Sequence, residues 1–312
     1  MINPQVYSVM AELFAGAAAP PARGDWLARR NQSEGFYAGM FAAQFGQVDC
    51  AVEKIMVPAG DGTDIECASY SPNSGSFDRV ILYFHGGGFI GGSVASHQLW
   101  CSWLAVETNS QVVSAGYRLA PESPAPVPQE DAYSAAAFFA ARNKNDSNLR
   151  PFVVGGDSSG AGLAVGVALM ARDRKDYLID ALFLIQPMLD DRTEEIAVEK
   201  LPLLTWSPDD NATAWEALIG DRKGTDDVSI YVAPSRAKDL SELPPTFLEI
   251  CEIDLFFAEG FSFLTHLVKA GVSVDAYLVR GVPHAFDVIA PNAAVSVRAM
   301  ANRMGFLRSI TG

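Results

Sequence analysis

The sequence predicts an α/β fold built on a mostly parallel sheet with helices on both faces. Three observations carry this prediction. Hydrophobic residues make up 49% of the 312 residues, which allows a large buried core. Unbroken apolar runs of strand length recur along the chain, and most of them are separated by segments long enough for a helix. Strands buried on both faces show such unbroken runs, whereas strands with one solvated face alternate.

The first 45 residues predict two helices. In the first, apolar residues recur at helical spacing at Val6, Met10, Leu13 and Phe14, and the pattern stops at a pair of prolines. The second helix is expected over about Trp26 to Phe45. Its aromatic residues are too many for a solvated tail, so we expect this segment to pack over another part of the protein.

From residue 46 the pattern indicates strands. Val52 to Val57 and Ile65 to Tyr70 flank a glycine-containing turn and predict a hairpin. The expected strands after the hairpin are Val80 to Phe84, Gln111 to Ala115, Phe152 to Val154, Ala181 to Ile185, Thr246 to Ile250 and Val274 to Leu278. These six apolar strands, most of them separated by helices, predict the parallel part of the sheet.

One interval between strands, residues 190–232, is longer than the others and differs in composition. It holds two tryptophans and many acidic residues. We therefore expect a core formed by residues 46–189 and 233–312, with 190–232 inserted as a helical cap at the carboxyl edge of the sheet. Residues 1–45 are expected to contribute N-terminal helices to the same cap.

The composition limits the partners and the location. A formal net charge of -14 argues against binding to nucleic acid or an anionic membrane. No apolar run reaches the roughly 20 residues of a membrane-spanning helix. The widely spaced cysteines, expected to be buried thiols of a reducing compartment, are Cys50, Cys67, Cys101 and Cys251. No basic residue precedes the short apolar stretch at residues 13–19, so a signal peptide is not expected and a cytoplasmic location is.

Residues 151–170 predict a strand, a sharp turn and a buried helix. Ser158 lies in the turn, at the centre of a G-x-S-x-G pattern that is typical of a nucleophile elbow. Gly156 and Gly160 lack side chains where the strand and the helix must nearly touch. This pattern alone fits an ordinary glycine-rich turn equally well. Residues 160–166 also imitate a dinucleotide fingerprint, but the acidic residue expected after the next strand comes only at Asp190.

A serine nucleophile needs a base and an acid that orients the base. In hydrolases with such an elbow, the chain order is serine, acid, histidine. Two of the four histidines follow Ser158. His266 lies in a helix expected over Phe257 to Ala270 and faces away from its apolar stripe, so it is expected to be exposed. That stripe is Phe261, Leu264 and Val268. His284 lies in the loop after the last strand, where the base is expected.

The candidate acids lie on or after the strand that begins at Thr246. They are Glu249, Glu252, Asp254 and Glu259. Glu249 falls within the strand and Glu259 within the following helix, which leaves Glu252 and Asp254 in the intervening loop. Spacing does not separate these two, and either carboxylate could instead cap a helix.

Three successive glycines, Gly86, Gly87 and Gly88, follow His85 at the end of a strand. Backbone N–H groups in such a segment can approach a substrate oxygen and stabilise a tetrahedral oxyanion. Together with the elbow, this loop predicts a serine hydrolase. His85 is expected to shape the loop and not to transfer protons, because it precedes the elbow.

These motifs, in this order, resemble those of the hormone-sensitive-lipase-like (bacterial) branch of α/β-hydrolase esterases. The matching segments are His85-Gly86-Gly87-Gly88-Phe89, the Y-R-L-A-P-E of residues 117–122, Glu130-Asp131-Ala132, the G-D-S-S-G of residues 156–160, the Q-P-M-L-D of residues 186–190 and Leu243-Pro244-Pro245-Thr246. The resemblance spans roughly residues 80–286. It implies an α/β-hydrolase fold with a mostly parallel eight-stranded sheet, flanking helices and a helical cap.

The resemblance also implies roles for particular residues. Asp254 occupies the position of the family's catalytic aspartate and His284 that of its base, beside Ser158 as nucleophile. The implied oxyanion donors are the N–H groups of Gly87, Gly88 and Ser159. The chain departs from the family pattern at Ser159, which replaces alanine, at Leu255, which replaces proline, and at Ala258, where the second acid of the turn is missing.

We expect a carboxylesterase that hydrolyses small esters with short to medium acyl chains through an acyl-enzyme, without a metal or other cofactor. The alternatives are the same residues acting on an amide, formamide or lactone, and a small-molecule receptor of the same fold. Receptors that resemble this branch have lost the base, whereas His284 is present. A nicotinamide-dependent oxidoreductase is a more remote alternative. By resemblance, a homodimer that pairs the edge strand Val274 to Leu278 is also expected.

Overall fold

A computed structural model of the chain describes residues 2–16, 19–146, 149–194 and 203–311. Part of the expected cap insertion, residues 195–202, therefore lies outside the described residues. At the centre is one eight-stranded sheet of order β1-β2-β4-β3-β5-β6-β7-β8. Its strands are β1 (Ala51–Pro58), β2 (Asp64–Ser71), β3 (Arg79–Phe84), β4 (Ser110–Ala115), β5 (Phe152–Asp157), β6 (Ala181–Ile185), β7 (Thr246–Ile253) and β8 (Val274–Pro283).

The pairing confirms both parts of the predicted sheet. β1 and β2 form an antiparallel hairpin, and β2 pairs antiparallel with β4. All pairs from β4 across to β8 are parallel. β8 is an edge strand, and its Leu278 is half exposed. The homodimer through this strand stays a prediction.

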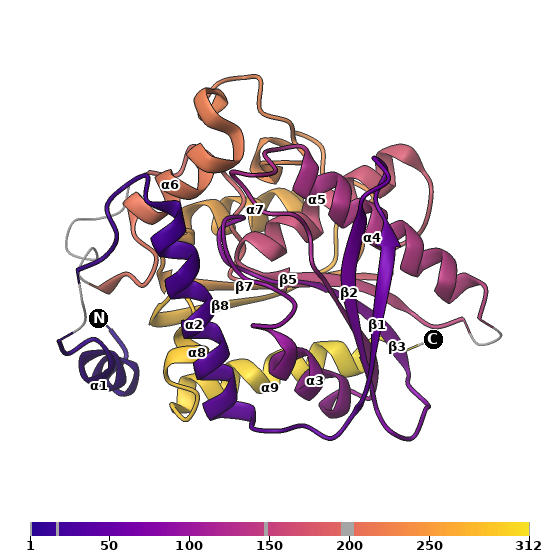
Figure 1. Ribbon diagram of the computed structural model, residues 1–312, viewed down its shortest axis with the longest axis horizontal. Helices are drawn as coiled ribbons and strands as arrows, with labels where there is room; N and C mark the ends of the chain where they lie inside the picture. Colours follow the sequence, from indigo (N-terminus) through magenta and orange to yellow (C-terminus); the bar gives the residue numbers. More distant parts are fainter. Residues whose placement is uncertain (1, 17–18, 147–148, 195–202, 312) are drawn as a thin grey trace.

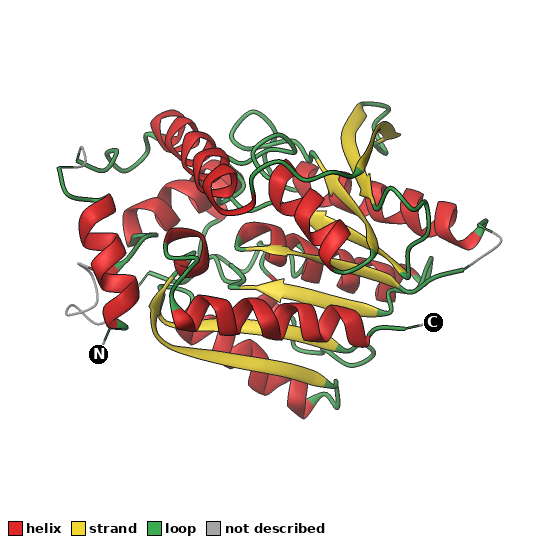
Figure 2. Ribbon diagram, turned by 90° about the horizontal axis from the view of Figure 1, so that it is seen from below, coloured by secondary structure: helices red, strands yellow, loops and turns green. Residues whose placement is uncertain are grey.

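Helices cover both faces of the sheet (Figures 1 and 2). They are α1 (Pro4–Leu13), α2 (Trp26–Phe45), α3 (Gln98–Glu107), α4 (Val127–Lys144), α5 (Ser159–Arg174), α6 (Pro208–Ile219), α7 (Phe257–Lys269), α8 (Phe286–Ile289) and α9 (Ala294–Ser309). α4, α5 and α7 lie on one face, and α3 and α9 lie on the other. α2 crosses the end of the sheet and contacts α3, α6 and α8.

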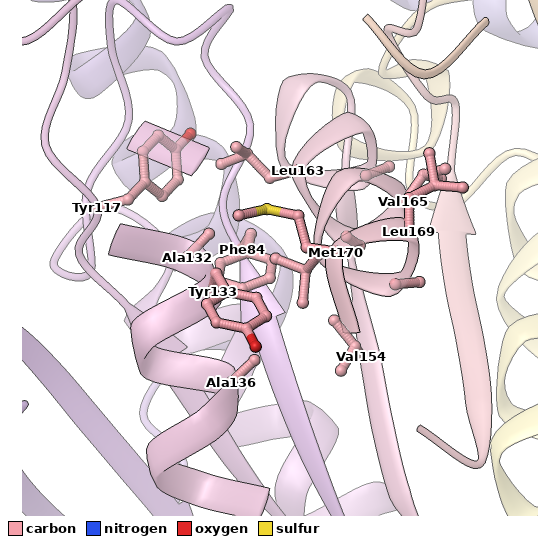
Figure 3. Packing of buried hydrophobic residues seen from close by; sticks show 14 of the residues in the cluster. Phe84, Tyr117, Ala132, Tyr133, Ala136, Val154, Leu163, Val165, Leu169 and Met170 are labelled. Atoms are coloured by element: carbon pink, nitrogen blue, oxygen red, sulfur yellow. The ribbon is translucent and has the colours of Figure 1, made fainter. Parts of the chain in front are cut away.

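Alternate residues of each central strand enter two different cores. On β3, Leu82 and Phe84 belong to the cluster packed against α4 and α5, whereas Ile81 and Tyr83 belong to the cluster against α3 and α9. Figure 3 shows Phe84 among side chains of α4 and α5, including Met170. Because both faces of the strand are buried, polar and apolar residues do not alternate along it. The sequence instead shows an unbroken apolar run.

Two expectations about single residues need correction. On α7, two residues of the expected stripe, Phe261 and Val268, are exposed, and the third, Leu264, packs against the core. Phe263 and Leu267 are the fully buried residues of this helix. The helix carries apolar residues on adjacent faces, and its packing against β7 and β8 selects the buried one. His266 is exposed, as predicted. Three of the cysteines are buried, but Cys50 is only half-buried.

None of the described helices has the length and hydropathy needed to cross a membrane.

Candidate active site

Ser158 lies at a sharp turn between β5 and α5. Its backbone has φ 55° and ψ -121°, a strained conformation for a residue with a side chain, and its N–H donates to the carbonyl of Ile185 at 2.9 Å. A Cβ added at Gly156 would lie 2.6 Å from the carbonyl carbon of Gly160, and one added at Gly160 would overlap the carbonyl oxygen of Phe84. The two glycines therefore allow the close approach that the turn requires.

Ser158, His284 and Asp254 form one continuous chain of hydrogen bonds. Ser158 Oγ lies 3.0 Å from His284 Nε2, and His284 Nδ1 lies 2.7 Å from Asp254 Oδ2. All three side chains are buried. A carboxylate only accepts hydrogen bonds, so His284 Nδ1 carries the proton and the lone pair of Nε2 faces the serine. In this state the imidazole can take the serine proton.

The surroundings of His284 favour its charged form. Burial acts to lower the pKa of the imidazole, but Asp254 acts in the opposite direction through its charge and its hydrogen bond. The more distant carboxylates of Asp157 and Asp287 add to this effect, and the pKa of His284 lies above its ordinary value. An imidazolium formed during reaction is therefore stabilised.

The structure separates the four candidate acids. Asp254 contacts His284, and its Oδ1 accepts from the N–H of Phe256 at 3.1 Å. Glu252 accepts from the N–H of Gly281 at 2.7 Å. The other two are engaged elsewhere, because Glu249 pairs with Arg303 and Glu259 accepts from the N–H of Leu189. Of the four, Asp254 alone reaches the imidazole.

The glycine loop after β3 lies beside the elbow. The N–H of Gly86 donates to Asp157 Oδ1 at 3.1 Å, which ties the loop to the residue before Ser158. Among the described residues, the N–H groups of Gly87 and Gly88 have no intramolecular acceptor. Both glycines have positive φ, 119° and 63°. Such donors are free to bind a substrate oxygen.

His85 shapes this loop. It is buried, its Nδ1–H donates to the carbonyl of Gly86 at 2.9 Å, and its ring stacks on Tyr117 at 4.4 Å between centroids. Tyr117 Oη in turn donates to the carbonyl of His85 at 2.7 Å. Burial lowers the pKa of His85 to about 3, so the ring stays neutral at physiological pH.

Segments from both expected cap regions approach the site. A Cβ added at Gly88 would lie 2.5 Å from Cη2 of Trp206, which shows that the indole rests on the glycine loop. Thr205 Oγ1 donates to the carbonyl of His284 at 2.6 Å. On α2, Arg29 pairs with Asp210 of α6 at 2.7 Å. None of the sequence motifs indicated the contact between Thr205 and His284.

A small cavity of about 30 Å³ opens beside Ser158 and His284. Its walls are mainly aromatic and apolar side chains from α2, α3 and α9, with polar groups behind the catalytic loop. The lining includes Tyr37, Phe41, Phe45, Trp100, Met300, Gln186, Asp287 and Arg303. The space is larger than the 10–15 Å³ or so that one water molecule requires. Within the described residues, no group of three or more His, Cys, Asp or Glu side chains is arranged to hold a metal ion.

Comparison with known proteins shows the family of the chain. The alpha/beta hydrolase fold family matches residues 81–288. The esterase LipI of Mycobacterium tuberculosis is 31% identical over 247 residues, which cover 77% of this chain and 74% of LipI. The carboxylic ester hydrolase LipN of the same organism is 29% identical over 249 residues, and the aligned part spans 77% of this chain and 65% of LipN.

Among solved structures, a bacterial heroin esterase is similar over the whole length of the chain. The TM-score is 0.86 and the sequence identity 30%, and the alignment covers 100% of this chain and 98% of that protein. The family match over residues 81–288 and the sequence identity to LipI indicate the same family of proteins. The chain therefore belongs to the α/β-hydrolase fold family, in the hormone-sensitive-lipase-like branch of esterases.

Proposed function

We propose that this protein is a serine carboxylesterase that hydrolyses small esters with short to medium acyl groups. The observation that carries the proposal is the hydrogen-bonded chain from Ser158 Oγ through His284 to Asp254, next to the unpaired N–H groups of Gly87 and Gly88. The esterases and carboxylic ester hydrolases among its relatives support the ester class.

In the proposed mechanism, His284 Nε2 takes the proton of Ser158 as Oγ attacks the carbonyl carbon of the ester. The N–H groups of Gly87, Gly88 and Ser159 bind the resulting oxyanion, and Asp254 stabilises the imidazolium. When the tetrahedral intermediate collapses, the C–O bond to the alcohol breaks and His284 gives its proton to the leaving alcohol. A water activated by His284 then attacks the acyl-enzyme and releases the acid.

The cavity and the cap support a small substrate. A space of only about 30 Å³ beside Ser158, lined by aromatic side chains, favours a short acyl group over a long one. We propose that residues 1–45 and 190–232 form a cap over the site. Three contacts support it: the Arg29–Asp210 pair between the two segments, the position of Trp206 on the glycine loop and the bond from Thr205 to His284.

The test is hydrolysis of p-nitrophenyl acetate, butyrate and decanoate together with matched anilides, a formamide and a lactone. We expect ester hydrolysis, faster for the short esters, and its loss in Ser158→Ala. A phosphonate should label Ser158, as identified by peptide mass analysis. His266→Ala, on an exposed position of α7, is the control and should retain activity. Retained turnover by Ser158→Ala would refute the mechanism, and a preference for the amide or lactone would refute the ester class.

A further inference from the structure

A cluster of buried polar groups lies directly behind the His284 loop. Three charged residues form this cluster: Glu249 of β7, Asp287 of α8 and Arg303 of α9. We call them the buried ion network. Arg303 is 1% exposed, and its Nε and Nη2 donate to the two oxygens of Glu249 at 3.0 and 2.5 Å. Its Nη1 donates to Asp287 Oδ2 at 2.5 Å. The network thus joins β7 to the two consecutive helices α8 and α9.

Gln186, the residue after β6, connects this network to the catalytic loop. Its Nε2 donates to Glu249 Oε1 at 3.0 Å and to Asp287 Oδ1 at 3.2 Å, and its Oε1 accepts from the N–H of Ala285 at 2.6 Å. Two carboxylates can only accept and an N–H can only donate, so the amide has one satisfactory orientation. Gln186 itself has a positive φ of 48°, which the surrounding bonds must hold.

Ala285 links Gln186 to the backbone of His284. It follows His284 directly and adopts the left-handed conformation, with φ 56° and ψ 25°. Alanine favours this conformation less than glycine does, so an external contact must select it. The bond from its N–H to Gln186 and the bond from Arg303 to Asp287 hold the backbone that follows His284.

Stability alone is a poor explanation for this arrangement. Burying three charges costs desolvation free energy that apolar side chains of similar volume would avoid, and replacing buried ion pairs by such residues is often neutral or stabilising. What charged and amide groups add is direction, because their hydrogen bonds fix atoms in place. Asp287 also contributes, after Asp254 and Asp157, to the raised pKa of His284.

We propose that Gln186, locked by the buried ion network, is a positioning residue that holds His284 Nε2 in line with Ser158 Oγ. This inference rests on the proposed serine hydrolase function of the same site. It assigns Gln186 no contact with the reacting atoms. Its role is to fix the backbone of Ala285 and, through it, the imidazole.

The first test is Gln186→Met, which keeps the side-chain length and removes both hydrogen-bonding functions. A displacement of the base of about 1 Å costs on the order of 100-fold in rate. We expect kcat to fall by about 10- to 100-fold, and by the same factor for p-nitrophenyl acetate and p-nitrophenyl butyrate. KM should change less than about threefold. Because Gln186 also lines the cavity, an effect on binding alone would appear in KM and differ between the two esters.

The second test is Gln186→Glu, which restores the acceptor for Ala285. The introduced carboxyl can donate to Glu249 or Asp287 only when it is protonated, and burial and repulsion from those carboxylates raise its pKa. The groups that face it or line the same cavity are Glu249, Asp287, Arg303, Asp157, Tyr37 and His284. The kcat of this variant relative to the original protein should therefore rise as the pH falls from about 8 to about 6.

A matched control separates position from folding. Arg236→Met breaks another buried pair, with Asp191, in which Nε and Oδ1 are 2.6 Å apart and neither residue lines the cavity. It should lower the melting temperature without a selective loss of kcat, whereas Arg303→Met should lower kcat as Gln186→Met does. Unchanged kcat in the folded Gln186 variants, or a pH-independent ratio for Gln186→Glu, would overturn the inference. If the unmodified protein hydrolyses no ester, the proposed function fails instead.

Discussion

Replacing Asp254 by asparagine is the sharpest test of the catalytic chain, because the structure determines how the new amide must lie. Asp254 Oδ1 accepts from the N–H of Phe256 at 3.1 Å, and Oδ2 faces His284 Nδ1 at 2.7 Å. In Asp254→Asn the amide oxygen must stay on Phe256, since an NH₂ group cannot accept that bond. The amide NH₂ therefore faces His284.

That orientation places the proton of His284 on the wrong nitrogen. Nδ1 must accept from the new NH₂ group, so the proton of the neutral ring moves to Nε2. Nε2 then donates to Ser158 Oγ across the present 3.0 Å contact and cannot accept the serine proton. Loss of the correct tautomer lowers kcat by about 10⁴, which corresponds to about 5.4 kcal/mol of transition-state stabilisation.

The assay is kcat for p-nitrophenyl acetate, together with the rate at which a phosphonate labels Ser158. Both rates should fall in parallel, because both need an activated hydroxyl. Glu252→Gln is the control, since Glu252 lies in the same stretch and accepts from Gly281, not from His284. It should retain kcat within about threefold. A loss of less than about tenfold in Asp254→Asn, or an equal loss in Glu252→Gln, would refute the assignment of the acid.

Three further predictions concern the base, the elbow and the cavity wall. Asp254, with Asp157 and Asp287, raises the pKa of His284 above its ordinary value of 6.5, and the imidazole must be neutral to act as a base. In a pH profile, kcat/KM should therefore fall as the pH decreases through a midpoint above 6.5. A midpoint below 6.5 would contradict this prediction. Ser159→Ala keeps the backbone donor and should leave kcat within about twofold, whereas a large loss would assign a role to the hydroxyl. Phe41→Ala removes a buried ring from the cavity wall, so it should raise kcat/KM for the octanoate ester relative to the acetate ester. In a urea titration it should lower the free energy of unfolding by about 3–5 kcal/mol. An unchanged chain-length preference would exclude Phe41 from the acyl site.

The sequence predicted the central strands well because stretches such as Val80 to Phe84 and Ala181 to Ile185 are uninterrupted apolar runs. It also predicted the position of Ser158 and of the glycine loop. Gly156 and Gly160 are required by contacts within the elbow and with the end of the adjacent strand β3, and Gly88 by a contact with Trp206. Such contacts restrict the residue at the position to glycine. A Cβ at any of the three would contact or overlap its neighbours.

The residues that the sequence did not assign act through distant partners. The hydrogen bonds among Gln186, Glu249, Asp287 and Arg303 join residues that are 16 to 101 positions apart in the chain. Periodicity failed on α7 for the same reason, because packing on β7 and β8 decides which of two apolar faces is buried. Contacts of this kind depend on the tertiary fold, and a single sequence contains no local pattern for them.

The sheet order explains why residues so far apart in sequence form one site. β3, β5, β6, β7 and β8 are neighbours in this order, and all of them are parallel. Their carboxyl ends therefore lie along one edge of the sheet. The residues at or just after these ends are His85, Ser158, Gln186, Asp254 and His284. The strand that carries Gln186 lies between those of the nucleophile and the acid, so its side chain reaches the histidine loop from behind while Asp254 holds the imidazole directly. The proposed positioning role of the residue after β6 thus depends on the same topology that brings Ser158, Asp254 and His284 together.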